Sequence, residues 1–416
     1  MNIVAGLFWP AADTQRLNNL MSNNISLFSF IGLMAISTVS ASNAVAGSFA
    51  GNMVDPLDGK LDMSKYLAEK KGVLPVPIII TEPAVGYGLG LAAVFFHDPL
   101  AGKTDPGREF EPNPDADGNL KPPSVSALFG GYTENGTWFG GGAHRGIWKD
   151  DTIRYKGVLA KTNINMKFYG LDSGNGGLSD NPVKFNTQAN FLLQELVFRM
   201  KTSDFFAGLK YSYLDTDNTF DTSELFPDAG LPVAEFDSTS AGLGVVFVYE
   251  GLNNTITPSK GLKAQFEATN YGDTWGGDAE FNKYRLYANY WFPVKSDWVV
   301  GLRADGSAVK GDAPFYEYPY IDLRGIPALR YQGEETLVGE TEVRYDFTQR
   351  WSAIGFVGAG KALSDVGEGD SETVISKGLG FRYLIARRFG MRAGIDVAWG
   401  PEDTAFYIQV GSAWGR

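Results

Sequence analysis

Apolar and polar side chains alternate along most of this chain, in segments of about ten residues each. Because successive side chains of a strand point to opposite faces of a sheet, this period of two predicts β-strands. Residues 282–292 show it clearly, with Tyr284, Leu286, Ala288, Tyr290 and Phe292 on one face and Lys283, Arg285, Tyr287 and Asn289 on the other. Such segments are longer than the usual strand of about five or six residues, and they match a tilted crossing of a bilayer.

The same alternation returns in later segments, which are residues 298–307, 337–347, 379–385, 391–399 and 406–414. Aromatic side chains such as Trp298, Trp351 and Trp399 stand near the segment ends. A soluble β-sandwich alternates too. Here, however, the second face carries charges of both signs, which a water-filled lumen accepts and lipid does not. We therefore predict an all-β fold, a transmembrane antiparallel β-barrel.

The connectors between segments tend to alternate between long and short, as the outer loops and periplasmic turns of outer-membrane barrels do. Residues 310–335 form the longest connector of the C-terminal half. Counting residues 76–81 and 85–96 as the first two strands gives about 16 strands, an even number, as bacterial barrels require. Residues 97–123 form a long Pro- and Asp-rich connector where a short turn is expected, which does not fit the alternation.

One segment reads as an apolar helix instead, residues 25–39, and the pattern Ala44-Val45-Ala46 of a signal-peptidase site follows it. About fifteen residues are too few for a membrane-spanning helix. We predict a signal peptide over residues 1–46, a short polar segment with an exposed helical turn or two over 47–75, and the barrel over 76–416. The alternative is that residues 25–39 anchor the chain in a membrane.

Composition agrees with a membrane barrel, since 51 of the 416 residues are glycine and 13% are aromatic. The net charge of −12 argues against a nucleic-acid partner, and the lack of cysteine excludes disulfides and thiolate metal sites. The two histidines, His97 and His144, have no nucleophile motif around them and are expected in a loop and on the lumen wall. The Asp-rich residues 113–117 lack the glutamate that closes a calcium loop. We therefore expect no enzyme activity, no cofactor and no metal.

Residues 321–333 read IDLRGIPALRYQG and stand shortly before the strand segment ETEVRYDF. This loop resembles the sixth outer loop of the BamA/TamA outer-membrane barrel superfamily, also called the bacterial surface antigen family. The resemblance implies that the Arg324-Gly325 pair folds back into the lumen, where the arginine meets acids of the inner wall. Independently of the family, Glu340 and Glu342 face inward by the period-two count, and a guanidinium pairs well with carboxylates. The alternative is a solvated loop arginine.

Other segments resemble the same family in the same order along the chain. Residues 74–90 resemble its opening hairpin, residues 253–272 resemble a strand start with a Pro-x-x-Gly turn, and residues 380–400 resemble strands near its end. The last strand would carry the family's C-terminal signal, formed by Phe406, Ile408, Val410 and Trp414.

The chain departs from the family pattern in three places. Only residues 47–75 precede the barrel, whereas assembly and translocation members carry periplasmic repeat domains there. Gly358 stands where the inner-wall motif usually has an aspartate. Gly415-Arg416 follow Trp414, whereas the family's signal normally ends on an aromatic residue. The first departure bears most on whether the protein handles client proteins.

The resemblance implies a protein of the Gram-negative outer membrane, exported by a cleaved signal peptide, with a role in outer-membrane protein insertion, translocation or surface display. Its expected partners are outer-membrane lipid and lipopolysaccharide, the assembly machinery that inserts the barrel itself, and a periplasmic protein. Nucleic acid is not among them. A passive pore or a structural barrel without client proteins is the second hypothesis, because the sequence shows no substrate.

Overall fold

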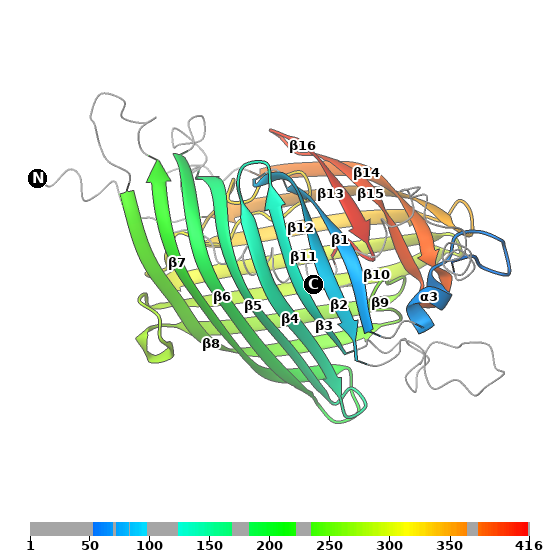
Figure 1. The fold of residues 1–416 in the computed structure, drawn as a ribbon, viewed down its shortest axis with the longest axis horizontal. Coiled ribbons are helices and arrows are strands. Elements are labelled where there is room, and N and C mark those ends of the chain that lie inside the picture. The colour runs from blue at the N-terminus through cyan, green and yellow to red at the C-terminus, as the bar shows by residue number, and fades with distance from the viewer. Residues whose placement is uncertain are drawn as a thin grey trace, which may run out of the picture.

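A computed structural model of the chain describes residues 53–69, 72–82, 84–97, 124–168, 183–221, 234–363 and 373–414. They contain sixteen strands in one antiparallel sheet that curls into a barrel, with neighbours in the sequence paired throughout (Figure 1). The predicted all-β barrel of 16 strands is confirmed. The predicted signal peptide, residues 1–46, and the Asp-rich residues 113–117 lie outside the described residues.

The strands are β1 (Gly72–Glu82), β2 (Gly86–Phe96), β3 (Val125–Thr133), β4 (Trp138–Trp148), β5 (Ile153–Phe168), β6 (Val183–Arg199), β7 (Phe205–Asp221), β8 (Ala234–Leu252), β9 (Gly261–Tyr271), β10 (Phe281–Lys295), β11 (Trp298–Gly311), β12 (Glu335–Tyr345), β13 (Trp351–Leu363), β14 (Thr373–Ala386), β15 (Met391–Trp399) and β16 (Thr404–Val410). The helical elements are short: α3 (Ser64–Glu69), η2 (Asp273–Trp275) and η3 (Arg387–Phe389). None of the helices in the described ranges is long and apolar enough to cross a membrane.

The connectors divide the barrel into two ends. At one end, which we call the turn end, strands are joined by short segments such as residues 149–152, 296–297 and 387–390. The longest connector that is fully described, residues 312–334 between β11 and β12, belongs to the opposite end, which we call the loop end. Since each strand reverses the direction of the one before it, connectors alternate between the two ends.

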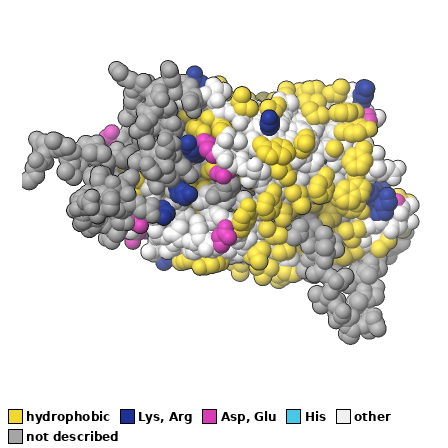
Figure 2. Space-filling model, turned by 90° about the horizontal axis from the view of Figure 1, so that it is seen from above, with side chains coloured by type: hydrophobic (Ala, Val, Ile, Leu, Met, Phe, Trp, Pro, Cys, Tyr) yellow, Lys and Arg dark blue, Asp and Glu magenta, His cyan; other side chains and the backbone are white. Residues whose placement is uncertain are grey.

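The two faces of the wall differ as the alternation predicts. On β10, Leu286 and Tyr290 are 56% and 46% exposed on the outer face, whereas Lys283 and Asn289 are buried on the lumen side. Apolar side chains cover much of the wall in Figure 2, and most of the charged ones lie towards its two ends. An apolar band with charged rims is what a barrel wall that faces lipid requires.

The barrel closes without a strand ladder between its first and last strands. Among the described residues, β1 pairs only with β2, and β16 pairs only with β15. The sequence of β1 explains this in part, because Pro75 and Pro77 have no backbone N–H to donate. Proline is tolerated in a strand where the missing group would face an unpaired edge. We call the junction between β16 and β1 the seam.

Side chains hold the seam together instead of backbone hydrogen bonds. Leu74 of β1 packs in one buried cluster with Met391 of β15 and Val410 of β16. On the outer surface, Tyr87 of β2 stacks on Phe406 of β16, with the ring centroids 5.6 Å apart. The seam therefore rests on apolar contacts, which are less directional than a strand ladder.

Residues 53–69 form a clasp at the turn end. Their aspartates surround Arg350 of the β12–β13 turn, whose side chain is 1% exposed and lies 2.5–2.7 Å from Asp55, Asp58 and Asp62. Leu67 of α3 is 1% exposed and packs in the same apolar cluster as the seam, so this helical turn is not exposed as predicted. The first strand also begins at Gly72, earlier than the predicted boundary. The clasp thus ties the N-terminal side of the seam to the β12–β15 wall.

Candidate functional site

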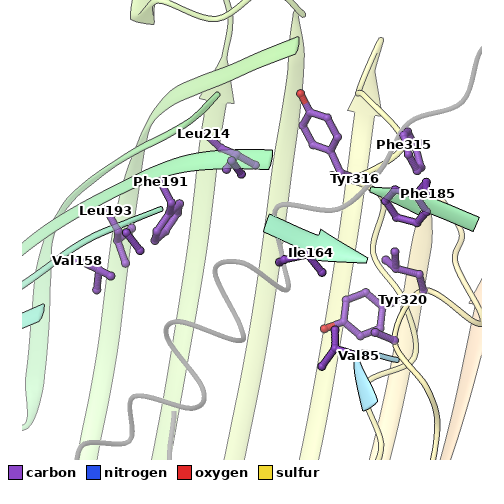
Figure 3. Packing of buried hydrophobic residues seen from close by; sticks show 14 residues of the cluster. Val85, Val158, Ile164, Phe185, Phe191, Leu193, Leu214, Phe315, Tyr316 and Tyr320 are labelled. Atoms are coloured by element: carbon purple, nitrogen blue, oxygen red, sulfur yellow. The ribbon is translucent and has the colours of Figure 1, made fainter. Parts of the chain in front are cut away.

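Residues 312–334, which we call the lumen loop, fold into the barrel rather than out into solvent. Phe315, Tyr316 and Tyr320 of this loop pack against Phe185 of β6 and other apolar residues of the β5–β7 wall (Figure 3). The inward-facing side chains there are apolar, although the wall is charged closer to the turn end. The loop therefore finds an apolar surface inside the lumen.

A second set of contacts fixes the lumen loop to the opposite part of the wall. Ile321, Leu323 and Ile326 form a buried cluster with Val338 of β12 and Val374 of β14. Between the two clusters, the loop carboxylate Glu317 is fully buried and accepts a hydrogen bond of 2.6 Å from Lys283 Nζ of β10. A loop held on both sides by apolar packing crosses the lumen instead of lining one face of it.

Arg324 of the lumen loop meets three carboxylates of the inner wall. Its Nε and Nη2 both donate to Glu340 Oε1, at 3.0 and 2.6 Å. Its Nη1 donates to Asp396 Oδ2 at 2.8 Å and lies 2.9 Å from Glu342 Oε2. Glu340 and Glu342 belong to β12 and Asp396 to β15, so a single side chain joins the loop to two separate strands. We call Arg324 and these three acids the anchor.

The flat face of the same guanidinium lies over the ring of Phe356 in β13, with Arg324 Cζ 3.5 Å from the ring centroid. An arginine can stack on an aromatic face while its edge donates hydrogen bonds to acids. A lysine has no flat face and no fork of donors. The anchor therefore uses properties that only arginine has among the cationic side chains.

Gly325 is required beside Arg324 for two reasons. Its φ is +85°, a left-handed conformation that favours glycine. A Cβ at this position would also lie 3.1 Å from both Ala398 Cβ and Gly400 N at the end of β15. Its backbone N–H donates to the hydroxyl of Tyr407 in β16 at 2.8 Å. The Arg-Gly pair thus brings the loop backbone against β15 and β16.

Glu340 links the anchor to a further part of the chain. While its Oε1 accepts from Arg324, its Oε2 accepts from Nη1 of Arg303 in β11 at 3.3 Å and from the indole Nε1 of Trp414 at 2.7 Å. Trp414 is 3% exposed and lies beyond the end of β16. One buried carboxylate therefore contacts both the lumen loop and the C-terminal end of the barrel.

The predicted C-terminal signal divides between wall and lumen. Phe406, Ile408 and Val410 lie in β16, where the strand ends. Gly411, with φ +80°, turns the chain inward, and the carbonyl of Trp414 accepts a hydrogen bond of 3.3 Å from Asn289 Nδ2 of the lumen wall. Trp414 therefore does not share the outer face with Phe406, as the alternation had indicated, because the strand breaks before it.

Two further arginines, Arg303 and Arg382, help to compensate the three acids of the anchor. Arg382 of β14 donates to both oxygens of Asp396, at 2.5 and 2.9 Å. Around the anchor, Arg303, Arg324 and Arg382 lie together with Glu340, Glu342 and Asp396. Arg303 also lies 3.1 Å from Asp305 and 3.3 Å from Asp322. Buried charges are tolerated when each has a partner, and the loss of one partner is costly.

Asp396 was not among the residues predicted for this site. The family pattern places an acid at Gly358 of β13, but here Leu323 of the lumen loop fills that space. A Cβ at position 358 would lie 2.5 Å from Leu323 Cδ2. The acid comes from β15 instead. The only signal in the sequence was that Asp396 falls on the charged face of its strand, which did not connect it to Arg324.

The chain's two histidines lie side by side on the outer wall. The hydroxyl of Ser126 in β3 lies 2.7 Å from His97 Nε2 and 2.8 Å from His144 Nδ1. His144 has the same parity on β4 as Trp138 and Trp148, which are 38% and 44% exposed. The expectation of a lumen-wall histidine is therefore wrong. Its ring belongs to the aromatic outer surface, 6.2 Å from that of Trp148.

Within the described ranges, no group of three or more His, Asp or Glu side chains is arranged to hold a metal ion. The anchor itself is a closed set of ion pairs and a stacked ring. What it can do is mechanical: it fixes a long loop inside the barrel and couples that loop to β12, β15 and the C-terminal residues.

A family model described as the Omp85 superfamily domain matches residues 161–401, which is more than half of the chain. No curated protein matches the sequence significantly. The fold is similar to that of BamA from Haemophilus ducreyi lacking POTRA domains 1–3, with a TM-score of 0.52 and 11% identity, covering 82% of this chain and 71% of that one.

Two CdiB structures are similar to about the same degree. CdiB from Escherichia coli has a TM-score of 0.54 and 11% identity, covering 81% of this chain and 61% of that one. CdiB from Acinetobacter baumannii has a TM-score of 0.51 and 9% identity, covering 81% of this chain and 59% of that one. This chain thus spans about three fifths of the CdiB chains. At such low identity the likeness extends to the fold alone.

Proposed function

Because this chain belongs to the Omp85 superfamily, we propose that it resides in a bacterial outer membrane and takes part in the insertion, translocation or surface display of other proteins. Under this proposal the turn end faces the periplasm and the loop end faces the outside. Its partners are then outer-membrane lipid and lipopolysaccharide, the machinery that inserts the barrel itself, and a periplasmic protein that delivers clients.

The observation that carries this proposal is the seam. An unpaired strand edge exposes a row of backbone donors and acceptors and acts as a template for another strand. Here the described residues of β1 and β16 pair on one side only, and apolar contacts such as the Tyr87–Phe406 stack hold them together. A client strand can replace such contacts at a lower cost than it can break a hydrogen-bonded ladder.

The contents of the lumen also favour a role in handling proteins over a passive pore. A passive pore needs an open channel, whereas the lumen loop crosses this barrel and is held by apolar packing on two sides and by the anchor. Trp414, on the side of the turn end, donates a hydrogen bond to Glu340 of the anchor. The interior of this barrel is occupied by a loop and by its own C-terminal end. Such a barrel is better suited to handling chains at its seam than in its lumen.

The second hypothesis, a passive pore, has one observation in its favour. The lumen side of the β5–β9 wall carries charged side chains of both signs. They form ion pairs that include Arg154–Glu250 at 2.8 Å and Lys210–Glu267 at 2.6 Å. Such a lining suits water and small ions. Under this hypothesis the seam would stay closed in function.

A reversible lock on the seam tests the proposal. The chain has no cysteine, so Tyr87→Cys and Phe406→Cys, which replace side chains 53% and 39% exposed, create the only two thiols. A short bis-maleimide with a reducible centre then joins β2 to β16. The protein is reconstituted in lipid vesicles with an unfolded client barrel, and client folding is followed by protease protection and by gel migration without heating.

We expect the protein to speed client folding, the linked form to lose this effect, and reduction of the linker to restore it. The two single-cysteine variants, treated with the same reagent, are the controls and should remain active. If the unlinked protein does not speed folding, or if the linked form works equally well, the insertion role is wrong. A steady conductance in planar bilayers that is unaffected by the linker would instead support the passive pore.

A further inference from the structure

A small pocket, partly open to solvent, lies inside the barrel at the turn end. Its lining comes from the inner faces of β10–β15, from the β8–β9 turn and from the residues that follow β16. Glu342 of the anchor belongs to its lining, and Trp291 and Ile354 provide apolar wall.

Three arginines from three strands line this pocket: Arg344 of β12, Arg382 of β14 and Arg392 of β15. Arg382 is committed to Asp396, to which it donates twice. The other two share one carboxylate, because Arg344 Nε lies 3.2 Å from Asp346 Oδ1 and Arg392 Nη2 lies 3.4 Å from Asp346 Oδ2. Two guanidiniums on one acid leave a local excess of one positive charge.

Donors are in excess as well as charge. The side chain of Arg344 donates no well-formed hydrogen bond to the described residues, although it is 12% exposed and its Nε is buried. Arg392 uses Nη1 on the hydroxyl of Ser352, at 2.6 Å. The hydroxyls of Thr257 and Ser412 also line the pocket, and in the described part of the chain they accept from backbone N–H groups at 3.4 and 3.2 Å, which leaves their own protons to donate.

The acid on the opposite side does not cancel this excess. Glu342 lies 2.9 Å from Arg324 of the anchor, so the charge of Glu342 is compensated by a cation that does not line the pocket. A partly buried cation is stabilised when an anion completes its pairing, and guanidiniums match the oxygens of phosphate or carboxylate. Donors on β12, on β15, on the β8–β9 turn and after β16 approach from several directions, which suits a tetrahedral anion better than a planar one.

We propose that this pocket binds a phosphate group, held by Arg344 and Arg392 with the hydroxyls of Thr257 and Ser412. The site borders the anchor, since Glu342 belongs to both, but the four groups that hold the phosphate are not anchor residues. The proposal does not depend on whether the barrel handles clients. The phosphate can be free or part of a lipid headgroup, and both sources are compatible with a pocket at the turn end of the lumen.

Thermal unfolding of the full chain in detergent tests the proposal, with sodium phosphate compared to sodium chloride and sodium acetate at equal ionic strength. We expect phosphate to raise Tm saturably and the other two salts to have little effect. Glycerol 3-phosphate serves as the soluble headgroup probe. A rise with both phosphate and glycerol 3-phosphate assigns the site to headgroups, and a rise with phosphate alone assigns it to the free ion.

The variants Arg344→Met and Arg392→Met should each weaken the phosphate response about tenfold or more, since a hydrogen bond to a charged group contributes about 1.5–3 kcal/mol. Each leaves Asp346 with the other arginine and with the hydroxyl of Ser352, so neither strands a buried charge. Lys295→Met, at the exposed end of β10, removes the same charge outside the pocket and should respond like the wild type.

Equal shifts with acetate or chloride, or full responses in both arginine variants, would overturn the proposal. Should the variants fail to fold, equilibrium dialysis of the wild-type protein against radioactive phosphate decides the question by itself. Saturable binding that excess acetate does not displace supports the site. Absence of binding, or displacement by acetate as effective as by unlabelled phosphate, contradicts it.

Discussion

Arg324 Nη1 donates to Asp396 Oδ2 at 2.8 Å, although the two residues stand 72 positions apart in the chain. Asp396 also accepts from both Nη groups of Arg382. One carboxylate of β15 therefore connects the lumen loop to β14. This acid takes the part that the family pattern gives to position 358, which is occupied here by a glycine under Leu323. The anchor is complete, but it is built from a different strand.

Replacing Arg324 with alanine should free the lumen loop without unfolding the barrel. Glu340 would keep Arg303 and Asp396 would keep Arg382, but Glu342 would lose its cation. Breaking a buried pair costs about 3–5 kcal/mol. We expect unchanged strand content by circular dichroism and faster tryptic cleavage after Arg330, the tryptic site that the variant retains in the lumen loop.

Arg324→Lys should rescue this loss only in part, because an ammonium group lacks the fork and the flat face that meets Phe356. Lys310→Ala, which removes an exposed charge at the end of β11, is the control and should be cut like the wild type. Unchanged cleavage in Arg324→Ala would mean that apolar packing alone holds the loop.

Restoring the family's acid, as Gly358→Asp, should destabilise this protein. The new Cβ would meet Leu323 Cδ2 at 2.5 Å and Glu340 Cγ at 3.2 Å. Overpacking of this kind costs about 1–3 kcal/mol, before the repulsion from Glu340 is added. Urea unfolding of Gly358→Asp, Leu323→Ala and the double variant measures the coupling. We expect the double variant to be more stable than the sum of the two single effects, and simple additivity would refute the steric account.

Trp414→Phe should weaken the tie between the C-terminal end and the anchor. The substitution keeps an aromatic ring beside Trp291 but removes the N–H that donates to Glu340 at 2.7 Å. A hydrogen bond to a charged acceptor contributes about 1.5–3 kcal/mol. The temperature at which heated samples change from the folded to the unfolded gel mobility should therefore fall. Trp399→Phe, whose side chain is 40% exposed on the outer wall, should change this little. If Trp414→Phe and Trp399→Phe lower this temperature equally, the hydrogen bond from Trp414 to Glu340 does not stabilise the barrel as predicted.

The clasp should release in acid. The hydrogen bond from Arg387 lowers the pKa of Asp55 from 3.8 to about 2, and the hydrogen bond from Arg350 lowers the pKa of Asp58. A carboxyl whose pKa is lower in the folded state stabilises it above the unfolded pKa, and this contribution is lost as the pH falls through the folded pKa. The clasp should therefore hold above about pH 4 and loosen towards about pH 2.

A spin label on Leu57→Cys, a side chain 76% exposed, reports the state of the clasp through its mobility. We expect slow motion at neutral pH and fast motion near pH 2. In a background with both Arg350→Ala and Arg387→Ala, where Asp55, Asp58 and Asp62 lose their cations, motion should be fast at every pH. A label on Leu363→Cys of β13 is the control for the barrel as a whole. Slow motion in this double-variant background would show that apolar contacts of Leu67 hold the clasp.

Local sequence rules were sufficient for the wall of the barrel. Strand alternation depends only on which side chains face lipid and which face water, so Leu286 and Lys283 could be assigned to opposite faces from their parity. The same parity placed Glu340 and Glu342 on the lumen side, where both now contact Arg324. The face on which a side chain lies depends on its neighbours in the same strand, so it can be predicted without knowing the other strands.

What only the tertiary structure decided are contacts between distant strands. Asp396 reaches Arg324 because β15 curves round to face the lumen loop, and Trp414 reaches Glu340 because the chain turns inward at Gly411. His97 and His144 meet because β3 places Ser126 between them. Closure of a sheet into a barrel sets such distances, and alternation carries no information about it. The sequence alone therefore determined the strands and their faces, whereas the partners across the lumen and at the seam follow from how the sheet closes.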